Sequence, residues 1–367
     1  MDLNGHLHQR SKQMPLSKIQ GISGQVTPNF GRRNLVINGD MQIAQRGTSS
    51  SSFGLHTVDR FSHVSSRDQF VATQEQSTDV PTGQGYTKSF KITTTTPETT
   101  IDGLNYNAVR YIFEAQDLQH LCWGTSAAKS LSVSFWVKSS VTGTYVTSNY
   151  FYDPNRNITV PYTINSANTW EYKTIVIPGD TGGTINNDNG SGLAIQFVLS
   201  VGPDYQGTVS TSWGSYVNAR WGNGQTAQMM NVNGATWAIT GLQVEVGSTP
   251  TEFEHRSAGE ELALCQRYYQ EYQACGQEWI YIEGNNATHK WWQSPITVPM
   301  RATPTTTNTG FTGASFAGST VSSLTRQGIS ANRVSWRVTL AGAAGGAYEV
   351  RHTDQFDQDK IHMDAEL

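Results

Sequence analysis

Aromatic side chains set among amides and hydroxyls are the groups in this sequence best suited to chemistry. One group, Trp213, Tyr216 and Trp221, lies in a stretch rich in glycine, asparagine and serine. A second, larger group consists of Trp279, Tyr281, Trp291, Trp292, Asn285, Asn286 and His289. Flat aromatic faces can stack on pyranose rings while nearby amides bond sugar hydroxyls, provided that the rings point outward. We predict that these residues bind a ligand; packing of each tryptophan in a core or an interface is the alternative.

The alternation of strands helps to separate outward-pointing rings from core rings. Residues 131–138 alternate between apolar and mostly polar side chains, and Trp136 falls on the polar side, so it is a further candidate. Trp291 and Trp292 are neighbours, and adjacent residues of a strand face opposite sides. At least one of the two should therefore reach a surface or a subunit interface.

Catalytic signatures are missing from the sequence. It contains no P-loop, HExxH or GxSxG pattern. Glycoside hydrolysis needs two suitably spaced carboxylates, and among 29 acidic residues some pair always fits, so composition alone carries no weight. We predict a protein that is not an enzyme and that uses no cofactor and no metal.

Composition and charge narrow the class further. The 367 residues are 15% charged, against about 25% in ordinary domains, yet 10% are aromatic and 35 are glycine. This balance is typical of β-sandwiches with many turns. The formal net charge of −4 argues against nucleic-acid binding. No run of 18 apolar residues and no signal peptide is seen, so we expect synthesis in a cytoplasm and no membrane insertion.

The elements expected from periodicity fall into four segments. Residues 1–33 are polar and either a disordered tail or an extended docking arm, with Leu16, Ile19 and Ile22 as apolar anchors. Residues 34–256 contain regular short strands separated by turns, as in a jelly-roll sandwich. In this reading residues 33–47 and 237–247 are its first and last strands, lying side by side. Residues 170–177 are expected to form a strand packed on both faces.

A helix is predicted where this pattern ends. Residues 257–274 begin with a capping box, and an apolar stripe follows at spacings of three, four and three, formed by Leu262, Cys265, Tyr269 and Tyr272. It is either one amphipathic helix packed on the sandwich or a short trimeric neck. Residues 275–367 return to strand patterns and are expected to form a smaller β-sandwich tip. Three cysteines, an odd number, are interpreted as inert thiols; a Cys265–Cys275 bridge is the alternative.

Several phrases of the sequence resemble a module of bacteriophage tail fibres and related appendage proteins. They include the segment 34–47, which is also similar to the start of jelly-roll carbohydrate-binding modules, Val58-Asp59-Arg60-Phe61, and residues 131–138, 164–172, 253–257 and 260–269. Residues 299–304 and 364–367 resemble tip domains that follow this module. In such carbohydrate-binding modules a structural calcium often lies near the terminal strands. Asp40 and Glu245 are the matching acids here, while Gln42 stands where the pattern has an acid.

The resemblance implies a homotrimeric tail fibre, a component of the virion tail. Its N-terminal arm would dock on a tail, adaptor or baseplate protein, and its distal domains would adsorb to a host surface polysaccharide or receptor. Two alternatives stay open: a tailspike enzyme that depolymerises glycans, and a structural spacer or decoration protein that binds no ligand.

Overall fold

The fold was obtained as a computed structural model. It describes residues 32–66, 70–207, 212–273, 289–309, 315–316, 319–330, 333–341, 350–351 and 360–367. The chain divides into two units, Met1–Arg32 and Arg33–Leu367, and the account below concerns the second. The predicted docking residues Leu16, Ile19 and Ile22 lie outside the described residues.

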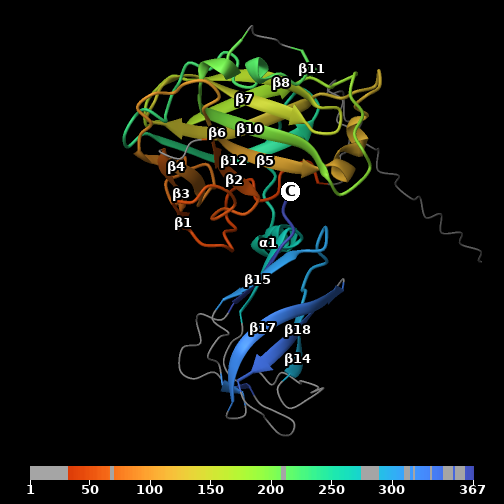
Figure 1. The fold of residues 1–367 in the computed structure, drawn as a ribbon. Coiled ribbons are helices and arrows are strands. Elements are labelled where there is room, and N and C mark those ends of the chain that lie inside the picture. The colour runs from red at the N-terminus through yellow and green to blue at the C-terminus, as the bar shows by residue number, and fades with distance from the viewer. Residues whose placement is uncertain are drawn as a thin grey trace, which may run out of the picture. The chain divides into compact units, whose positions relative to one another are not determined.

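Two six-stranded antiparallel sheets form the larger part of this unit (Figure 1). The first, here called sheet A, has the order β1 (Ser49–Ser50), β3 (Val71–Ser77), β4 (Ser89–Thr96), β12 (Thr236–Val246), β6 (Leu131–Ser139) and β9 (Glu171–Ile177). The second, sheet B, has the order β11 (Gly214–Ser215), β8 (Arg156–Ile164), β7 (Gly143–Phe151), β10 (Ser191–Val201), β5 (Tyr106–Glu114) and β2 (Phe61–Ser65). The predicted all-β sandwich is thus confirmed.

Aromatic rings from both sheets form the core between them. Phe135 of β6 lies edge-on to Phe197 of β10, with ring centroids 5.1 Å apart, and Phe197 in turn contacts Trp237 of β12 at 5.7 Å. All three side chains are fully buried. Burying rings of this size contributes about 1.5–3 kcal/mol each, so the alternating pattern of the strands fixes which face turns inward.

The opening segment lies beside β12 as predicted, but it is not a strand. The backbone N–H of Leu35 donates to the carbonyl of Val244 (2.9 Å), and that of Leu242 donates to the carbonyl of Gly39 (2.8 Å). Between these bonds the chain turns, with Asn38 and Met41 both at φ 62°. A Cβ on Gly39 would overlap the Leu242 carbonyl oxygen, which is why this close approach needs glycine. The turn breaks the ladder that the alternation of residues suggested.

The one α-helix of the described residues is shorter than predicted. It spans α1 (Ala258–Gln266), and the hydroxyl of Ser257 accepts the N–H of Glu260 (3.3 Å), which confirms the capping residue. Tyr269 lies beyond its end in β13 (Tyr269–Gln273), so the predicted helical stripe does not continue to Tyr272. Cys265 is buried with Ile37, and the residues after the helix pair in a sheet, Tyr269 opposite Asp364 and Tyr272 opposite Ile361, instead of continuing it. The three remaining helical turns are short 3₁₀ segments, η1 (Ala115–Leu121), η2 (Pro203–Tyr205) and η3 (Asn218–Arg220).

Two smaller antiparallel sheets come from the C-terminal third of the chain. One has the order β13, β20 (Lys360–Asp364) and β15 (Thr305–Thr309). The other has the order β14 (His289–Pro295), β18 (Arg333–Leu340), β17 (Ser319–Ser330), β16 (Ser315–Phe316) and β19 (Val350–Arg351). None of the helices in the described ranges is long and apolar enough to cross a membrane.

A buried charge network ties the end of the chain to the jelly roll. Arg60 forms an ion pair with Glu366, and their side chains are only 2% and 6% exposed. The Arg60 guanidinium also lies 3.4 Å from the ring centre of Tyr268. Arg46 approaches Glu366 at 3.4 Å and lies 3.7 Å from the ring centre of Tyr269. Burial alone would lower the pKa of Arg60, but Glu366 and the neighbouring tyrosines raise it above its ordinary value.

Candidate functional site

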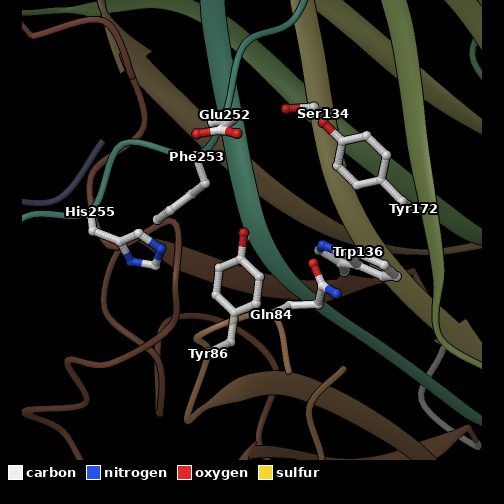
Figure 2. Close-up of a pocket in the computed structure, with 9 residues that line it drawn as sticks. Gln84, Tyr86, Ser134, Trp136, Tyr172, Glu252, Phe253 and His255 are labelled. Carbon is white, nitrogen blue, oxygen red and sulfur yellow. The ribbon is translucent and has the colours of Figure 1, made fainter. Parts of the chain in front are cut away.

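A cleft of about 550 Å³ lies on sheet A, bordered by residues of β6, β9 and β12 and by two loops. Its lining consists of Gln84, Tyr86, Ser134, Trp136, Tyr172, Gly241, Glu252, Phe253 and His255. Five of these nine residues are aromatic or imidazole rings, and the others are small or polar. Figure 2 shows Trp136 and Tyr172 on one side of the cleft and Tyr86, Phe253 and His255 on the other.

Strand alternation places the first pair of rings. Phe135 points into the core, so its neighbour Trp136 must point away from it. Tyr172 of β9 is directly opposite Trp136 in the strand register, and the ring centroids are 5.4 Å apart. The predicted outward position of Trp136 is therefore confirmed. Tyr172 is 47% exposed, so the expectation that β9 packs on both faces is wrong: β9 is an edge strand, and nothing in the described residues covers its outer side there.

Loops place the second group of rings. Tyr86 belongs to the segment 78–88 between β3 and β4, while Phe253 and His255 follow β12. Their ring centroids are 4.9–5.7 Å apart: 5.4 Å for Tyr86 and Phe253, 5.7 Å for Tyr86 and His255, and 4.9 Å for Phe253 and His255. Gly241, at a bulge of β12, makes room for them, since a Cβ there would lie 2.5 Å from the Tyr86 hydroxyl.

The polar groups of the cleft suit binding of hydroxyl-rich molecules. Burial raises the pKa of Tyr86 to about 12, so its hydroxyl remains a hydrogen-bond donor throughout the neutral range. Gln84 can donate and accept, and the Glu252 carboxylate accepts. Glu252 is the one carboxylate among the described lining residues, whereas glycoside hydrolysis uses two. The arrangement supplies stacking surfaces and hydrogen-bond partners for a ligand.

The predicted cluster Trp213, Tyr216 and Trp221 lies elsewhere, and Trp221 serves packing. Trp221 is only 6% exposed and forms part of a small apolar cluster on sheet B, which Tyr216 also contacts. Trp213 packs edge-on against Trp123 at 5.3 Å, and its indole N–H donates to the carbonyl of Pro178 (2.7 Å). The alternative of core packing therefore holds for Trp221, whereas Trp213 is only partly buried against the core. Ligand binding by Trp213 and Tyr216 stays a prediction.

The other predicted cluster is only partly described. Trp279, Tyr281, Asn285 and Asn286 lie outside the described residues. His289, Trp291 and Trp292 belong to β14, whose backbone pairs with β18, with Trp292 opposite Trp336. Ligand binding by this group stays a prediction.

Of the predicted neck residues, Cys265 and Tyr269 are buried within this chain. Burial also raises the pKa of the Cys265 thiol well above its ordinary value, which agrees with an inert role. Leu262 lies on α1 and Tyr272 in β13. Their part in a trimer stays a prediction.

The acids considered for calcium are held by hydrogen bonds. Glu245 accepts from the side chain of Gln243 (2.9 Å) and from Thr251, and Asp40 accepts from the side chain of Gln42 (2.8 Å). Burial raises the pKa of Asp40, although Gln42 and His255 oppose the shift. Within the described ranges, no group of three or more His, Cys, Asp or Glu side chains could hold a metal ion.

Reasoning from the sequence missed most of the cleft. Gln84, Tyr86 and Glu252 lie in loops without a periodic pattern. Phe253 and His255 belong to a segment that carries the family resemblance, and nothing in that segment indicates a binding site. A signal was present in Gly83-Gln84-Gly85-Tyr86, where glycines leave an aromatic ring on a turn. The two glycines adopt φ 76° and 81°, as such a turn requires.

Comparison with known proteins finds matches among solved structures alone. No family model matches the chain, and no curated protein does. Similar solved structures include the enzymatically active domain of tailspike protein 4 of bacteriophage CBA120, at 16% identity and a TM-score of 0.32, covering 58% of this chain and 21% of that one. Another is the family 11 carbohydrate-binding module of a Clostridium thermocellum cellulosomal cellulase, at 13% identity and a TM-score of 0.27, covering 57% of this chain and 98% of that one.

A third similar structure is TmCBM61 in complex with β-1,4-galactotriose, at 10% identity and a TM-score of 0.28, covering 59% of this chain and 99% of that one. Because all three TM-scores lie below 0.5, we base neither fold nor function on these similarities. The matched part of the tailspike chain is also only about a fifth of its length.

Proposed function

We propose that this protein is a phage tail fibre and that its jelly roll binds a glycan of the host surface in the cleft. The observation that carries the proposal is the arrangement of the cleft. Trp136 and Tyr172 lie opposite Tyr86 in the cleft, and Gln84 and Glu252 add polar groups to its lining. Rings that remain accessible beside hydrogen-bonding groups are the arrangement expected for stacking on sugar rings. The resemblance of the sequence to tail-fibre modules supports the proposal that the protein with this cleft is a tail fibre.

In this function the protein binds and does not turn over its ligand. The N-terminal arm would attach the fibre to the tail, and three copies would present three clefts to the host. A weak single site, with a dissociation constant on the order of millimolar, gains strongly when several sites on one particle engage together. The mass in solution, measured by light scattering, should be three times 40.3 kDa.

Alanine variants of the cleft test the binding function. The probe is an array of purified bacterial surface polysaccharides, on which the full chain is measured. Trp136→Ala and Tyr172→Ala should each weaken binding about tenfold, the loss expected for one stacking ring. The matched control is Tyr150→Ala on β7 of sheet B, where the ring packs beside Tyr152 and lies outside the cleft.

The results separate the proposal from its rivals. Unchanged binding in both cleft variants would show that another surface holds the glycan. If the native chain binds no polysaccharide, the cleft has no such function, and the result favours a structural spacer that binds no ligand. Release of reducing sugar ends during the same incubation would establish the depolymerase.

A further inference from the structure

The cleft carries negative charge with no cation to balance it. Glu252 is a lining residue, and no lysine or arginine lines the cleft within the described residues. Its carboxylate has no ion-pair partner in the part of the chain that the structure describes, where its backbone carbonyl, not its side chain, accepts hydrogen bonds. A second carboxylate, Asp40, lies close enough behind Tyr86 and His255 to affect both electrostatically.

Two cations near the cleft already form ion pairs. Lys138, two residues from Trp136, forms an ion pair with Asp79 at 2.8 Å. On the other side Arg33 lies 3.9 Å from Glu254, and its guanidinium donates to the hydroxyl of Thr251 (2.6 Å). A ligand anion could recruit either cation only by breaking these contacts.

These charges should give uncharged glycans and anionic glycans different affinities for the cleft. An uncharged sugar offers hydroxyl donors to the Glu252 carboxylate, and hydrogen bonds to an ionised acceptor are about twice as strong as neutral ones. A sugar with a carboxylate or sulfate would lose hydration in the cleft, find no lysine or arginine in the lining and meet a like charge. Specificity built from such repulsion is a common device at binding sites.

On the basis of the function proposed above, we propose that the cleft selects uncharged glycans and that Glu252 rejects glycans bearing carboxylate or sulfate groups. Glu252 is a specificity-determining residue in this scheme. Trp136 and Tyr172 provide stacking surfaces without regard to charge, so removing them weakens every ligand, whereas changing Glu252 alters the ratio between ligands.

Chemically matched polysaccharides test this selection. Acidic polysaccharides are printed beside their carboxyl-reduced forms, in which each uronate has become a neutral hexose of the same linkage, and beside neutral ones. The full chain is measured at one fixed pH and salt concentration for all forms. We expect neutral and carboxyl-reduced forms to bind at least tenfold more tightly than the acidic parents.

The outcomes distinguish this inference from the function on which it rests. Acidic parents bound as tightly as their reduced forms, or more tightly, would overturn the selection and leave glycan binding intact. A native chain that binds nothing on the array would overturn both.

Two variants assign the effect to one side chain. Glu252→Gln keeps a hydrogen-bond acceptor but removes the charge, so it should bind acidic parents about fivefold more tightly. It should bind reduced forms more weakly than the native chain does, because their hydroxyls lose an ionised acceptor. Glu75→Gln on β3 of the same sheet removes an equal charge outside the lining and leaves Lys91 without its partner. It should change neither class; equal gains in both variants, or none in Glu252→Gln, would show that Glu252 is not the selecting residue.

Discussion

Replacing Glu366 with glutamine tests how strongly the buried charge network holds the two parts of the Arg33–Leu367 unit together. Glu366 lies just beyond β20, which ends at Asp364. Here the side chain is 6% exposed and pairs with Arg60 and Arg46. We therefore expect the substitution to lower the free energy of unfolding.

The magnitude follows from what remains after the change. Removing one partner of a buried ion pair costs about 3–5 kcal/mol when the other charge is left without compensation. Arg60 would keep the face of Tyr268 and a hydrogen bond to the carbonyl of Ile112 (2.7 Å). Glutamine also keeps an acceptor oxygen, so we place the loss at about 2–3 kcal/mol, or a fall in melting temperature of roughly 5 °C.

Urea unfolding followed by tryptophan fluorescence measures this loss. Glu260→Gln on the exposed side of α1 is the matched control and should change stability by less than about 0.5 kcal/mol. The double variant Arg60→Met with Glu366→Leu should recover most of the loss, because no unpaired charge stays buried. A loss in Glu366→Gln no larger than that of the control would refute the reasoning that the pair is buried and required.

Three further changes have distinct expected results. Gly39→Ala should lower the free energy of unfolding by about 1–3 kcal/mol, since its Cβ would overlap the Leu242 carbonyl; an unchanged urea midpoint would show that the turn can move aside. Trp221→Ala should cost about 3 kcal/mol of stability yet leave glycan affinity unchanged at low temperature, whereas Tyr172→Ala should show the reverse in the same two assays. His63 is fully buried, and burial lowers its pKa to about 4. The free energy of unfolding should therefore be highest above pH 6.5, where the ring is neutral in both states, and should fall by about 3 kcal/mol as the pH drops to 4. His63→Gln removes that dependence, and stability curves of variant and native chain between pH 7 and 4 should converge on acidification; parallel curves would contradict it. The comparison with the native chain is needed because Asp59, whose pKa burial raises to about 6, contributes the opposite slope, its stabilisation being lost as the pH rises through 6.

Strands with clear alternation could be predicted from the sequence, since each buries one face. The pattern of residues 131–138 gave β6, and it placed Trp136 on the outer face, which became part of the cleft. The N-cap at Ser257 was predictable for a similar reason, because capping depends on residues close in sequence.

Features that depend on distant contacts could not be predicted in this way. The sequence around Asn38 and Met41 has the pattern of a strand, but the structure forms a turn there. The turn depends on the close contact between Gly39 and Leu242, which is 203 positions further along the chain. For Tyr172 and Trp221, the exposure of the ring could not be predicted from the sequence either. Whether each is covered depends on an edge strand in one case and on a loop folded over sheet B in the other.

The positions that carry the family resemblance divide unevenly between scaffold and cleft. Arg46, Arg60 and Tyr268 belong to those phrases and meet in the buried network, where they hold the end of the chain. Trp136 and Tyr172 also belong to them and supply the stacking surface. Gln84 and Glu252 lie outside every such phrase.

This division indicates what the resemblance can and cannot specify. The phrases describe a β-sandwich, its junction and a pair of rings that, in the proposed function, would stack on a sugar ring whatever its substituents. The hydrogen-bonding and charged groups that would tell one glycan from another come from the segment 78–88 and from Glu252. If the proposed function holds, exchanging that segment with the corresponding segment of a similar protein should therefore change the glycan bound while leaving the fold intact, since the buried network makes no use of it.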